Sequence, residues 1–499
     1  MRGTTLKTLK KSVRLLLIAY LTLPFLIFVG GWMKLYIAIP VILLVLFCAW
    51  KVYQDMPELW LPELTQDNLI KILFIIGVFA IWVYYSGIGK FVFQNSDHAT
   101  RNGIFNILVQ YDWPVINDKI LPENQGILSK TGMIYYIGFW LPSAVVGKVL
   151  GLRAGYYAQA VWALLGIVLT YFLICHYFKK LKVWPVFVFI FFSGLDIVGA
   201  YLTSMDYINS GTIWHLEWWG TPYQYSSMTT QLFWVFNQAI PAWLCTMLAY
   251  IQKNNRNLVY ILACCMLSST LPFVGLLAII LYLGITRKPA SLSGKCSWKE
   301  RLVFLIKDTC TLQNVLGGGL IGILSFLYLW GNLSGTHLMG ENVRGAEFDN
   351  SLAKLVLFLL LDIGVYVVLL YQYHKKDMFF YFVVLCLCLI PIFKVGYSND
   401  FCMRASIPGL FLIMVWVMEA LSASRKQKNY LLLCGLIAVL LVGSVTPVFE
   451  FRRTLTETYR RINSGEIVYA EDSKEVNILN SPNFSGDVEQ SFFYKYLAK

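Results

Sequence analysis

The stretch YILACCMLSSTLPFVGLLAIILYLGITR, residues 260–287, determines the predicted membrane topology of the whole chain. It is apolar and long enough to form one tilted helix across a membrane. The residues SSTLP in its middle favour a break, because Pro272 lacks a backbone donor and disfavours helix in the residue before it. The alternatives are therefore one long span, or a hairpin of two short helices at 258–270 and 272–286.

The charges of the flanking loops favour the hairpin. The N-terminal arm MRGTTLKTLKKSVR is basic and contains no acidic residue, which predicts a cytoplasmic N-terminus. If spans alternate from there and the hairpin is counted, every basic loop falls on the cytoplasmic side. Without the hairpin, the loop 287–308 and all later basic loops fall outside. The loop 51–68 carries more acidic residues than this predicts, but acids weigh little in the positive-inside rule. The basic loops are KKLK (179–182), QKNNRN (252–257), 287–308, HKKD (374–377) and SRKQKN (424–429).

Apolar segments recur along all 499 residues of the chain. The sequence is 58% hydrophobic and 14% charged, against about 25% charged in soluble domains, and its mean hydropathy is +0.61. Backbone amides in hydrocarbon must be bonded within their own element, so the spans are predicted to be helices. We expect an all-α polytopic membrane protein with about 13 transmembrane helices, two of them short. The predicted spans are 14–31, 35–52, 69–89, 155–178, 183–203, 232–251, 258–270, 272–286, 315–331, 351–373, 378–395, 403–422 and 430–448.

We interpret the surplus of basic residues as a feature of the cytoplasmic loops of a membrane protein, and not as a nucleic-acid-binding surface. The net charge is +13, from 41 basic and 28 acidic residues, and no aromatic–basic nucleic-acid module accompanies it. The 11 cysteines lie mostly in apolar runs and form no CxxC metal spacing, which favours small core residues. The first apolar run is not followed by an A-x-A cleavage site, so we interpret it as a retained signal anchor.

A long external segment follows the third predicted span. Within it, TGMIYYIGFWLPSAVVGKVLG (131–151) is apolar enough to cross the membrane, but counting it would move the basic KKLK loop outside. We therefore predict that it lies in, or dips into, the outer leaflet. The chain then divides into a transmembrane domain, 1–448, whose external loop 90–154 carries juxtamembrane helices, and an external polar tail, 449–499. No internal repeat is visible, which slightly disfavours transporters built from inverted repeats.

Asp97, in the stretch QNSDHATRNG (94–103), is the candidate catalytic residue. It follows shortly after a span, near the lipid headgroups, where a carboxylate can take a proton from an acceptor hydroxyl during sugar transfer. The alternative is a helix cap, with Ser96 or Asp97 opening a helix at 98–111. The two interpretations are compatible.

Arginines in the external segments are candidates for binding a lipid phosphate, because a guanidinium matches two phosphate oxygens at once. They are Arg101, Arg344 and Arg404. For Arg404 the alternatives are an interfacial anchor or an ion pair with Asp400, and for Arg344 a solvated loop face.

The external segment 204–231 is rich in aromatic residues. Sugar rings present apolar C–H faces that stack on indoles, so Trp218 and Trp219 are candidate sugar contacts; an interfacial aromatic belt is the alternative. His215 and Glu217, among these rings, distinguish the segment from an ordinary belt. Further donor or acceptor contacts are predicted at His98, Asn102, His337, Asn399 and Asp400.

A divalent cation, Mg²⁺ or Mn²⁺, is a less favoured addition to this site. Asp97 and His98 with His337 or Glu341 could hold one, but no local ligand spacing supports it, so no cofactor is predicted. Two acids, Asp196 and Asp362, fall inside apolar spans. Acids there are functional candidates, or are bonded to a neighbouring helix.

The order of these features resembles the GT-C glycosyltransferases, which include protein O-mannosyltransferases, oligosaccharyltransferases and the aminoarabinose transferases of lipid A. An acid follows an early span in a long first external loop, and the loop ends in the apolar stretch YYIGFWLPSAVVGKVLGLR. A helix with a basic inner end, LTYFLICHYFKKLK, comes next, and the broken span at 260–287 is similar to the family's paired short helices. The resemblance covers most of residues 70–290. The stretches LEWWGTPYQYSSMTTQLFWVFNQAIPAWL and YSNDFCMRASIPGLF are similar to those of bacterial membrane proteins with this fold.

The resemblance implies a polyprenyl-phosphate sugar donor, inversion at the sugar carbon and an aspartate base, carried onto Asp97. The family's usual pair of neighbouring carboxylates is replaced here by Ser96-Asp97-His98. We expect a glycosyltransferase that moves a sugar to a glycan, lipid or protein acceptor of the cell envelope, at the outer face of a bacterial inner or plasma membrane. The N-terminus is expected to be cytoplasmic and the C-terminus external. The alternatives are a polysaccharide polymerase or ligase, and a transporter or flippase of lipid-linked glycans.

Overall fold

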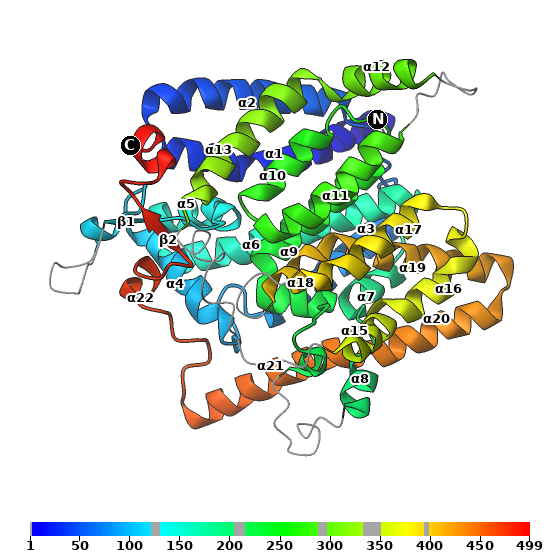
Figure 1. The fold of residues 1–499 in the computed structure, drawn as a ribbon. Helices are drawn as coiled ribbons and strands as arrows, with labels where there is room; N and C mark the ends of the chain where they lie inside the picture. Colours follow the sequence, from blue (N-terminus) through cyan, green and yellow to red (C-terminus); the bar gives the residue numbers. More distant parts are fainter. Residues whose placement is uncertain (1, 121–129, 204–214, 288–296, 333–350, 394–398) are drawn as a thin grey trace.

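The computed structural model describes residues 2–120, 130–203, 215–287, 297–332, 351–393 and 399–499. These residues are mostly helical and contain one two-stranded sheet, so the chain is an all-α polytopic membrane protein (Figure 1). The helices of the first half are α1 (Arg2–Trp32), α2 (Leu35–Asp55), α3 (Gln66–Tyr85), α4 (Asp97–Gln110), α5 (Leu141–Leu150), α6 (Leu152–Phe178), α7 (Trp184–Phe191), α8 (Asp196–Leu202), α9 (Met228–Ile251) and α10 (Leu258–Met266). Those of the second half are α11 (Thr270–Thr286), α12 (Trp298–Thr309), α13 (Gly319–Trp330), α15 (Leu352–Leu359), α16 (Val365–His374), α17 (Met378–Leu389), α18 (Asp400–Ala405), α19 (Ile407–Gln427), α20 (Tyr430–Gly443), α21 (Val445–Ser464) and α22 (Glu475–Leu479).

Ten helices in the described part of the chain are long and apolar enough to cross a membrane. Each of them overlaps one of the thirteen predicted spans, but the last, Tyr430–Ser464, continues 16 residues past the predicted end at 448 into the predicted polar tail. The three remaining predicted spans form the shorter helices α10, α11 and α17. The ten long helices are Thr8–Trp32, Leu35–Asp55, Gln66–Tyr85, Leu152–Phe178, Trp184–Leu202, Met228–Ile251, Gln313–Trp330, Leu352–His374, Asp400–Gln427 and Tyr430–Ser464.

The stretch 260–287 is broken, as its SSTLP sequence predicts. α10 ends at Met266 and α11 begins at Thr270, and the two helices pack against each other. At the break, the Ser269 hydroxyl donates a hydrogen bond to the Gln238 carbonyl of α9 at 2.8 Å. The break is therefore fixed against the most deeply buried of the ten long helices.

The stretch 131–151 does not form one continuous helix. Strand β1 covers Thr131–Met133, and α5 has only 10 residues. At 1.5 Å per residue, α5 is about 15 Å long, half the thickness of a bilayer's hydrocarbon core. It is too short to cross a membrane, and it packs against α4 and α6 instead.

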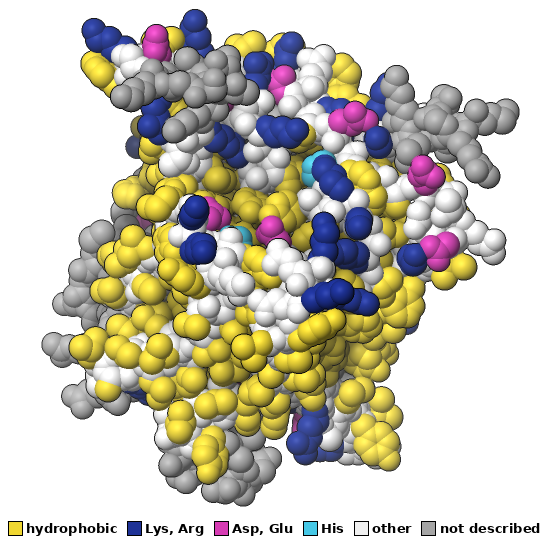
Figure 2. Space-filling model, turned by 90° about the vertical axis from the view of Figure 1, so that its right-hand side faces the viewer, with side chains coloured by type: hydrophobic (Ala, Val, Ile, Leu, Met, Phe, Trp, Pro, Cys, Tyr) yellow, Lys and Arg dark blue, Asp and Glu magenta, His cyan; other side chains and the backbone are white. Residues whose placement is uncertain are grey.

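The predicted basic loops meet at one end of the helix bundle. In Figure 1 this end is at the right, where the N-terminus, α12 and the turn between α19 and α20 lie. Figure 2 looks onto this side and shows Lys and Arg side chains gathered over it, with fewer acidic ones. This is the grouping that a hairpin at 260–287 predicts, because a single span there would separate the later loops from the earlier ones. The contacts that join the loops are Lys10–Glu58, Arg256–Asp55, Trp60–His176, Lys182–Ser422, Asn255–Asp308 and Gln372–Asn429.

The C-terminal tail folds back onto the segment 90–154. Strand β2 (Ser485–Asp487) pairs antiparallel with β1, and α22 packs on α4 (Figure 1). The Lys90 ammonium lies 2.6 Å from the Asp472 carboxylate. The predicted external loop and the predicted polar tail therefore form one assembly at the end of the bundle opposite the basic loops.

The centre of the bundle is formed by α9 and α19. Both are buried along most of their length, and Trp243 of α9 and Trp416 of α19 are fully buried. Trp82 of α3 stacks on Trp243 with ring centroids 6.0 Å apart. Because α9 is held on all sides, its first turns give a rigid support for the polar groups described next.

Candidate functional site

Two polar clusters lie at the end of the bundle opposite the basic loops. The Asp97–Arg404 cluster contains Asp97, Arg101, Tyr135, Tyr136, Asp400 and Arg404. The His215 cluster contains His215, Glu217, Gln224, Trp234, Glu450 and Arg453.

Asp97 is the first residue of α4. The Asp97 amide donates a hydrogen bond to Asn95 Oδ1 at 3.1 Å, and the Ser96 hydroxyl makes no capping hydrogen bond. The Asp97 carboxylate accepts a hydrogen bond from Arg101 Nη2, one turn later and 2.9 Å away. The Asp97 side chain is 41% exposed, whereas that of Arg101 is 8% exposed. A carboxylate that faces outward is thus paired with a buried guanidinium.

Arg404 brings a second guanidinium to the same place from a distant part of the chain. Its Nη2 lies 3.1 Å from Asp400 Oδ1, one turn earlier in α18. Its Nη1 donates a hydrogen bond to the Tyr136 hydroxyl at 3.2 Å, and Tyr136 accepts another from Tyr135. Arg404 is close enough for its charge to act on the Asp97 carboxylate. The cluster therefore combines residues from three separate segments of the chain, namely α4, the stretch that contains Tyr135 and Tyr136, and α18.

The two arginines keep Asp97 ionised. Burial opposes this by favouring the protonated carboxyl, but the charge and hydrogen bond of Arg101, together with the charge of Arg404, hold the pKa of Asp97 below its usual range. Burial raises the pKa of the Tyr135 hydroxyl well above its usual range, so this group stays protonated. The cluster therefore contains the carboxylates of Asp97 and Asp400, the guanidiniums of Arg101 and Arg404, and the neutral hydroxyl of Tyr135.

Each guanidinium has one buried nitrogen without a hydrogen-bond partner among the described residues. These nitrogens are Arg101 Nη1 and Arg404 Nε. Leaving a buried donor unpaired costs about 1–3 kcal/mol, and more when the group is charged. Two such donors beside an exposed carboxylate are suited to binding the oxygen atoms of an anion.

His98 and Asn102 fix the position of α4. His98 Nε2 donates to the Phe233 carbonyl at the start of α9, at 3.0 Å, and its Nδ1 accepts from Gln94. Burial and the charge of Arg101 lower the pKa of His98 to about 3, so the imidazole is neutral. Asn102 Nδ2 donates to Gln94 Oε1 at 2.8 Å. Both side chains are buried and orient the helix on which the catalytic candidate lies.

His215 lies between two carboxylates. Its Nδ1 is 3.0 Å from Glu450 Oε1 and its Nε2 is 3.3 Å from Glu217 Oε2, and the three side chains are at most 3% exposed. Burial alone would lower the pKa of His215, but the two carboxylates raise it to about 9. Glu450 also accepts hydrogen bonds from Trp234 Nε1, at 2.8 Å, and from Arg453. This cluster is therefore a buried ionic network in which the imidazole is protonated at neutral pH.

The two candidate tryptophans differ in their surroundings. Trp219 is buried and donates through Nε1 to Asp196 Oδ1 at 3.1 Å. Asp196 also accepts a hydrogen bond from Thr446 of α21 at 2.8 Å, so this membrane acid is bonded to a neighbouring helix. Trp218 is 47% exposed and lies edge-on to the His215 ring. Of the two indoles, that of Trp218 is the one accessible to a sugar.

The short helix α18 connects the two clusters. Asn399, just before it, adopts the left-handed conformation with φ 55° and donates through Nδ2 to the Pro222 carbonyl at 3.2 Å. The Cys402 thiol donates to the Gln224 carbonyl at 3.6 Å. The same helix carries Arg404, so the position of that guanidinium depends on the segment that forms the His215 cluster.

Two predicted contacts, His337 and Arg344, lie outside the described residues. Within the part of the chain that the structure describes, no group of three or more His, Cys, Asp or Glu side chains is placed to hold a metal ion. The cation site that would have used His337 therefore stays a prediction.

Sequence reasoning missed several members of both clusters. The sequence pattern places Tyr135 and Tyr136 in an apolar juxtamembrane stretch and Glu450 in the polar tail. Two consecutive hydroxyls in an external apolar stretch are one signal that could have found the tyrosines. A single acid among apolar and basic residues, in VTPVFEFRR, is the signal for Glu450.

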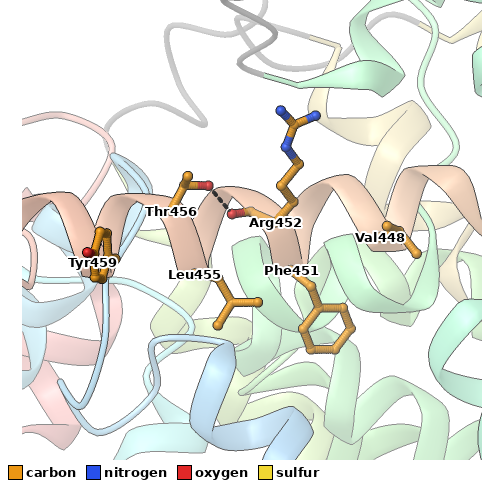
Figure 3. A pocket seen from close by; sticks show the side chains of 6 residues that line it. All are labelled: Val448, Phe451, Arg452, Leu455, Thr456 and Tyr459. Carbon is orange, nitrogen blue, oxygen red and sulfur yellow. Dashed lines mark hydrogen bonds between the residues drawn. The ribbon is translucent and has the colours of Figure 1, made fainter.

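A shallow hollow of about 450 Å³ lies on α21. Figure 3 shows Phe451 and Leu455 on one side of the helix, with the Arg452 guanidinium pointing to the other side. No member of either cluster lines the hollow, so it does not belong to the candidate site. The lining residues all come from this one helix and are Val448, Phe451, Arg452, Leu455, Thr456 and Tyr459.

Comparison with known proteins identifies no family for this chain. No protein-family model matches the chain, and no curated protein and no solved structure is significantly similar to it.

Proposed function

We propose that this protein is a membrane glycosyltransferase that moves a sugar from a polyprenyl-phosphate donor to an acceptor hydroxyl. One observation carries the proposal. The exposed Asp97 carboxylate lies beside the guanidiniums of Arg101 and Arg404, and each guanidinium keeps a buried donor without a partner in the described residues. A base next to unfilled anion-binding donors is the arrangement that transfer from a phosphate ester needs.

The reaction follows from these groups as a single displacement. The acceptor oxygen bonds to the anomeric carbon of the sugar while the bond from that carbon to the phosphate oxygen breaks. The acceptor proton passes to Asp97, which is ionised because its pKa is held low. Arg404 and Arg101 bind the leaving phosphate and stabilise the charge it gains. A single displacement inverts the configuration at the anomeric carbon.

The surrounding groups support a sugar between the two clusters. The exposed indole of Trp218 offers an apolar face for sugar C–H groups. α18 bears Arg404 at one cluster and contacts Gln224 at the other, so both clusters are held in one frame. In this proposal the Asp97–Arg404 cluster binds the phosphate and acceptor, and Trp218 contacts a sugar.

The charge distribution supports an external site. Basic loops mark the cytoplasmic end of membrane proteins, and here they meet at the end opposite both clusters. With this orientation the N-terminus is cytoplasmic, the tail is external, and the reaction occurs at the outer leaflet of a bacterial inner or plasma membrane. The acceptor is then a glycan, lipid or protein of the cell envelope.

The direct test uses the purified full-length protein in proteoliposomes. Each assay contains undecaprenyl phosphate that carries one tritium-labelled sugar, chosen from a panel, together with a mixture of envelope glycan and lipid acceptors. We expect label on an acceptor, or slow release to water, and loss of both in Asp97→Asn. No turnover of any donor, together with no effect of undecaprenyl phosphate on the unfolding temperature, would contradict the proposal.

A second candidate function, transport of a lipid-linked glycan, is favoured by one observation. Asp362 is buried within a long apolar helix, and its Oδ1 has no hydrogen-bond partner among the described residues. Buried acids of this kind occur in transport pathways. A transporter would move labelled lipid-linked glycan between leaflets and lose this activity in Asp362→Asn, while Asp97→Asn would retain it. A glycosyltransferase would instead lose sugar transfer in Asp97→Asn and retain it in Asp362→Asn.

A further inference from the structure

A groove of about 900 Å³ runs between α7 and α20. Trp184 and Phe191 line it from α7, and Leu433 and Leu441 line it from α20. It continues to Val448 on α21, and the 15 residue steps from Leu433 to Val448 correspond to about 22 Å along a helix. α19 and α20 form a hairpin whose turn lies at the basic end of the bundle (Figure 1). The groove therefore begins at the basic end and extends toward the middle of the hydrocarbon.

Two cations line the basic end of this groove. They are Lys182, just before α7, and Arg425, in the last turn of α19. The Lys182 ammonium donates a hydrogen bond to Ser422 Oγ at 2.6 Å and lies 5.5 Å from the centre of the Trp184 ring. Neither cation forms an ion pair with an acid in the described part of the chain. The groove is thus apolar along its length and positively charged at its mouth.

The positive charge at the mouth is not compensated by the protein. Burial, and then the charges of Lys180 and Arg425, lower the pKa of Lys182. Like charges held together repel one another, and an anion placed between them removes that repulsion. Basic residues near a membrane surface attract anionic lipid.

We propose that this groove binds one anionic glycerophospholipid, with its phosphate between Lys182 and Arg425 and an acyl chain between α7 and α20. The length accommodates this occupant, because the groove of about 22 Å is longer than the roughly 15 Å that the acyl chains of one leaflet span and leaves room for the headgroup. The charge also supports an anionic lipid. The headgroup of a zwitterionic lipid would add its own cation next to Lys182 and Arg425, whereas an anionic lipid adds none. The site lies at the end of the bundle opposite Asp97 and does not depend on the proposed transfer reaction.

Native mass spectrometry of the full-length protein in detergent tests the site. Phosphatidylglycerol and phosphatidylcholine with the same acyl chains are added in parallel series, and bound lipid is counted. We expect phosphatidylglycerol to bind at least about tenfold more tightly. The double variant Lys182→Gln/Arg425→Gln should lose this preference. Ile437→Trp, which fills the groove with a large side chain and keeps both cations, should weaken binding of both lipids.

The matched control is Lys375→Gln/Lys426→Gln, which removes two exposed cations outside the groove, one just after α16 and one in the last turn of α19. It should bind phosphatidylglycerol as the wild type does. Equal loss in the two double variants, or no lipid preference in the wild type, overturns the proposal in favour of unspecific annular lipid. Displacement of phosphatidylglycerol by an equal concentration of undecaprenyl phosphate overturns it in favour of a polyprenyl site. Unfolding temperatures without lipid check each variant's folding, and Ile437→Trp decides the outcome if the groove double variant is unfolded.

Discussion

The Asp97–Arg404 cluster and the His215 cluster lie at the same end of the bundle but differ in how completely their charges are bonded. Asp97 is 41% exposed, whereas the carboxylates that flank His215 are at most 3% exposed. Both ring nitrogens of His215 face a carboxylate, whereas two guanidinium nitrogens of the first cluster have no partner in the described residues. A fully bonded buried network gives rigidity, whereas buried donors without a partner, next to an exposed carboxylate, give a capacity to bind an anion. This difference is the reason why we propose ligand binding at the first cluster and a supporting role for the second.

The strongest test of this comparison is to replace Asp97, the proposed general base. We expect Asp97→Asn to lower turnover of a polyprenyl-phosphate sugar by about 10²–10⁴-fold, because a general base contributes that much. Substitution of the exposed Asp112, which lies outside both clusters, with Asn is the matched control and should leave turnover unchanged. Radiolabel transfer in proteoliposomes measures both. Equal rates for wild type and Asp97→Asn would remove Asp97 from the reaction.

The supporting role of the second cluster predicts a large loss of stability in Glu450→Gln. Breaking a buried ion pair from one side costs about 3–5 kcal/mol, because the charges of His215 and Arg453 stay buried with fewer partners. Glu457→Gln is the control on the same helix. Its ion pairs with Arg460 and Arg461 lie at the surface, where such pairs contribute about 0–1 kcal/mol. Thermal unfolding in detergent measures the difference, and equal stability of the two variants would contradict the assignment.

The same cluster predicts a loss of stability at alkaline pH. The carboxylates raise the pKa of His215 from about 6.5 to about 9, so its contribution is complete below pH 6.5 and is lost as pH rises through 9. The shift corresponds to about 3 kcal/mol. The fall in unfolding temperature between pH 7 and pH 9.5 should be smaller in His215→Gln than in the wild type. An identical fall in both would show that His215 is not protonated between Glu217 and Glu450.

The spans could be predicted from the sequence because they depend on local patterns. Runs of apolar residues gave the ten long helices, and the proline in SSTLP together with the charges of later loops predicted the break in 260–287. Hydrocarbon imposes these rules on each segment separately, without reference to its neighbours. The short helix α5 and the strand β1 in 131–151 were less predictable, since they depend on contacts with α6 and with the tail.

The clusters could be predicted only in part, because side chains far apart in the sequence complete them. Asp97 and Arg404 were recognisable as polar residues next to predicted spans. The hydrogen bond from Arg404 to Tyr136 joins residues 268 apart, and the contact of His215 with Glu450 joins residues 235 apart. No local pattern specifies which residues pair over such separations. The sequence could therefore suggest candidate residues, but not which of them form a buried network.

The smallest expected effect tests whether Arg404 acts by shape as well as by charge. Arg404→Lys keeps the positive charge for Asp400 but loses the planar fork that binds two phosphate oxygens. We expect the KM for a polyprenyl-phosphate sugar to rise about tenfold, the effect of losing one charge-assisted hydrogen bond of roughly 1.5 kcal/mol. The control is Arg153→Lys, an exposed arginine that stacks on Tyr157 at the start of α6 and should leave the KM unchanged. An unchanged KM in Arg404→Lys would mean that Arg404 only pairs with Asp400, and the Asp97–Arg404 cluster would then resemble the His215 cluster more than it differs from it.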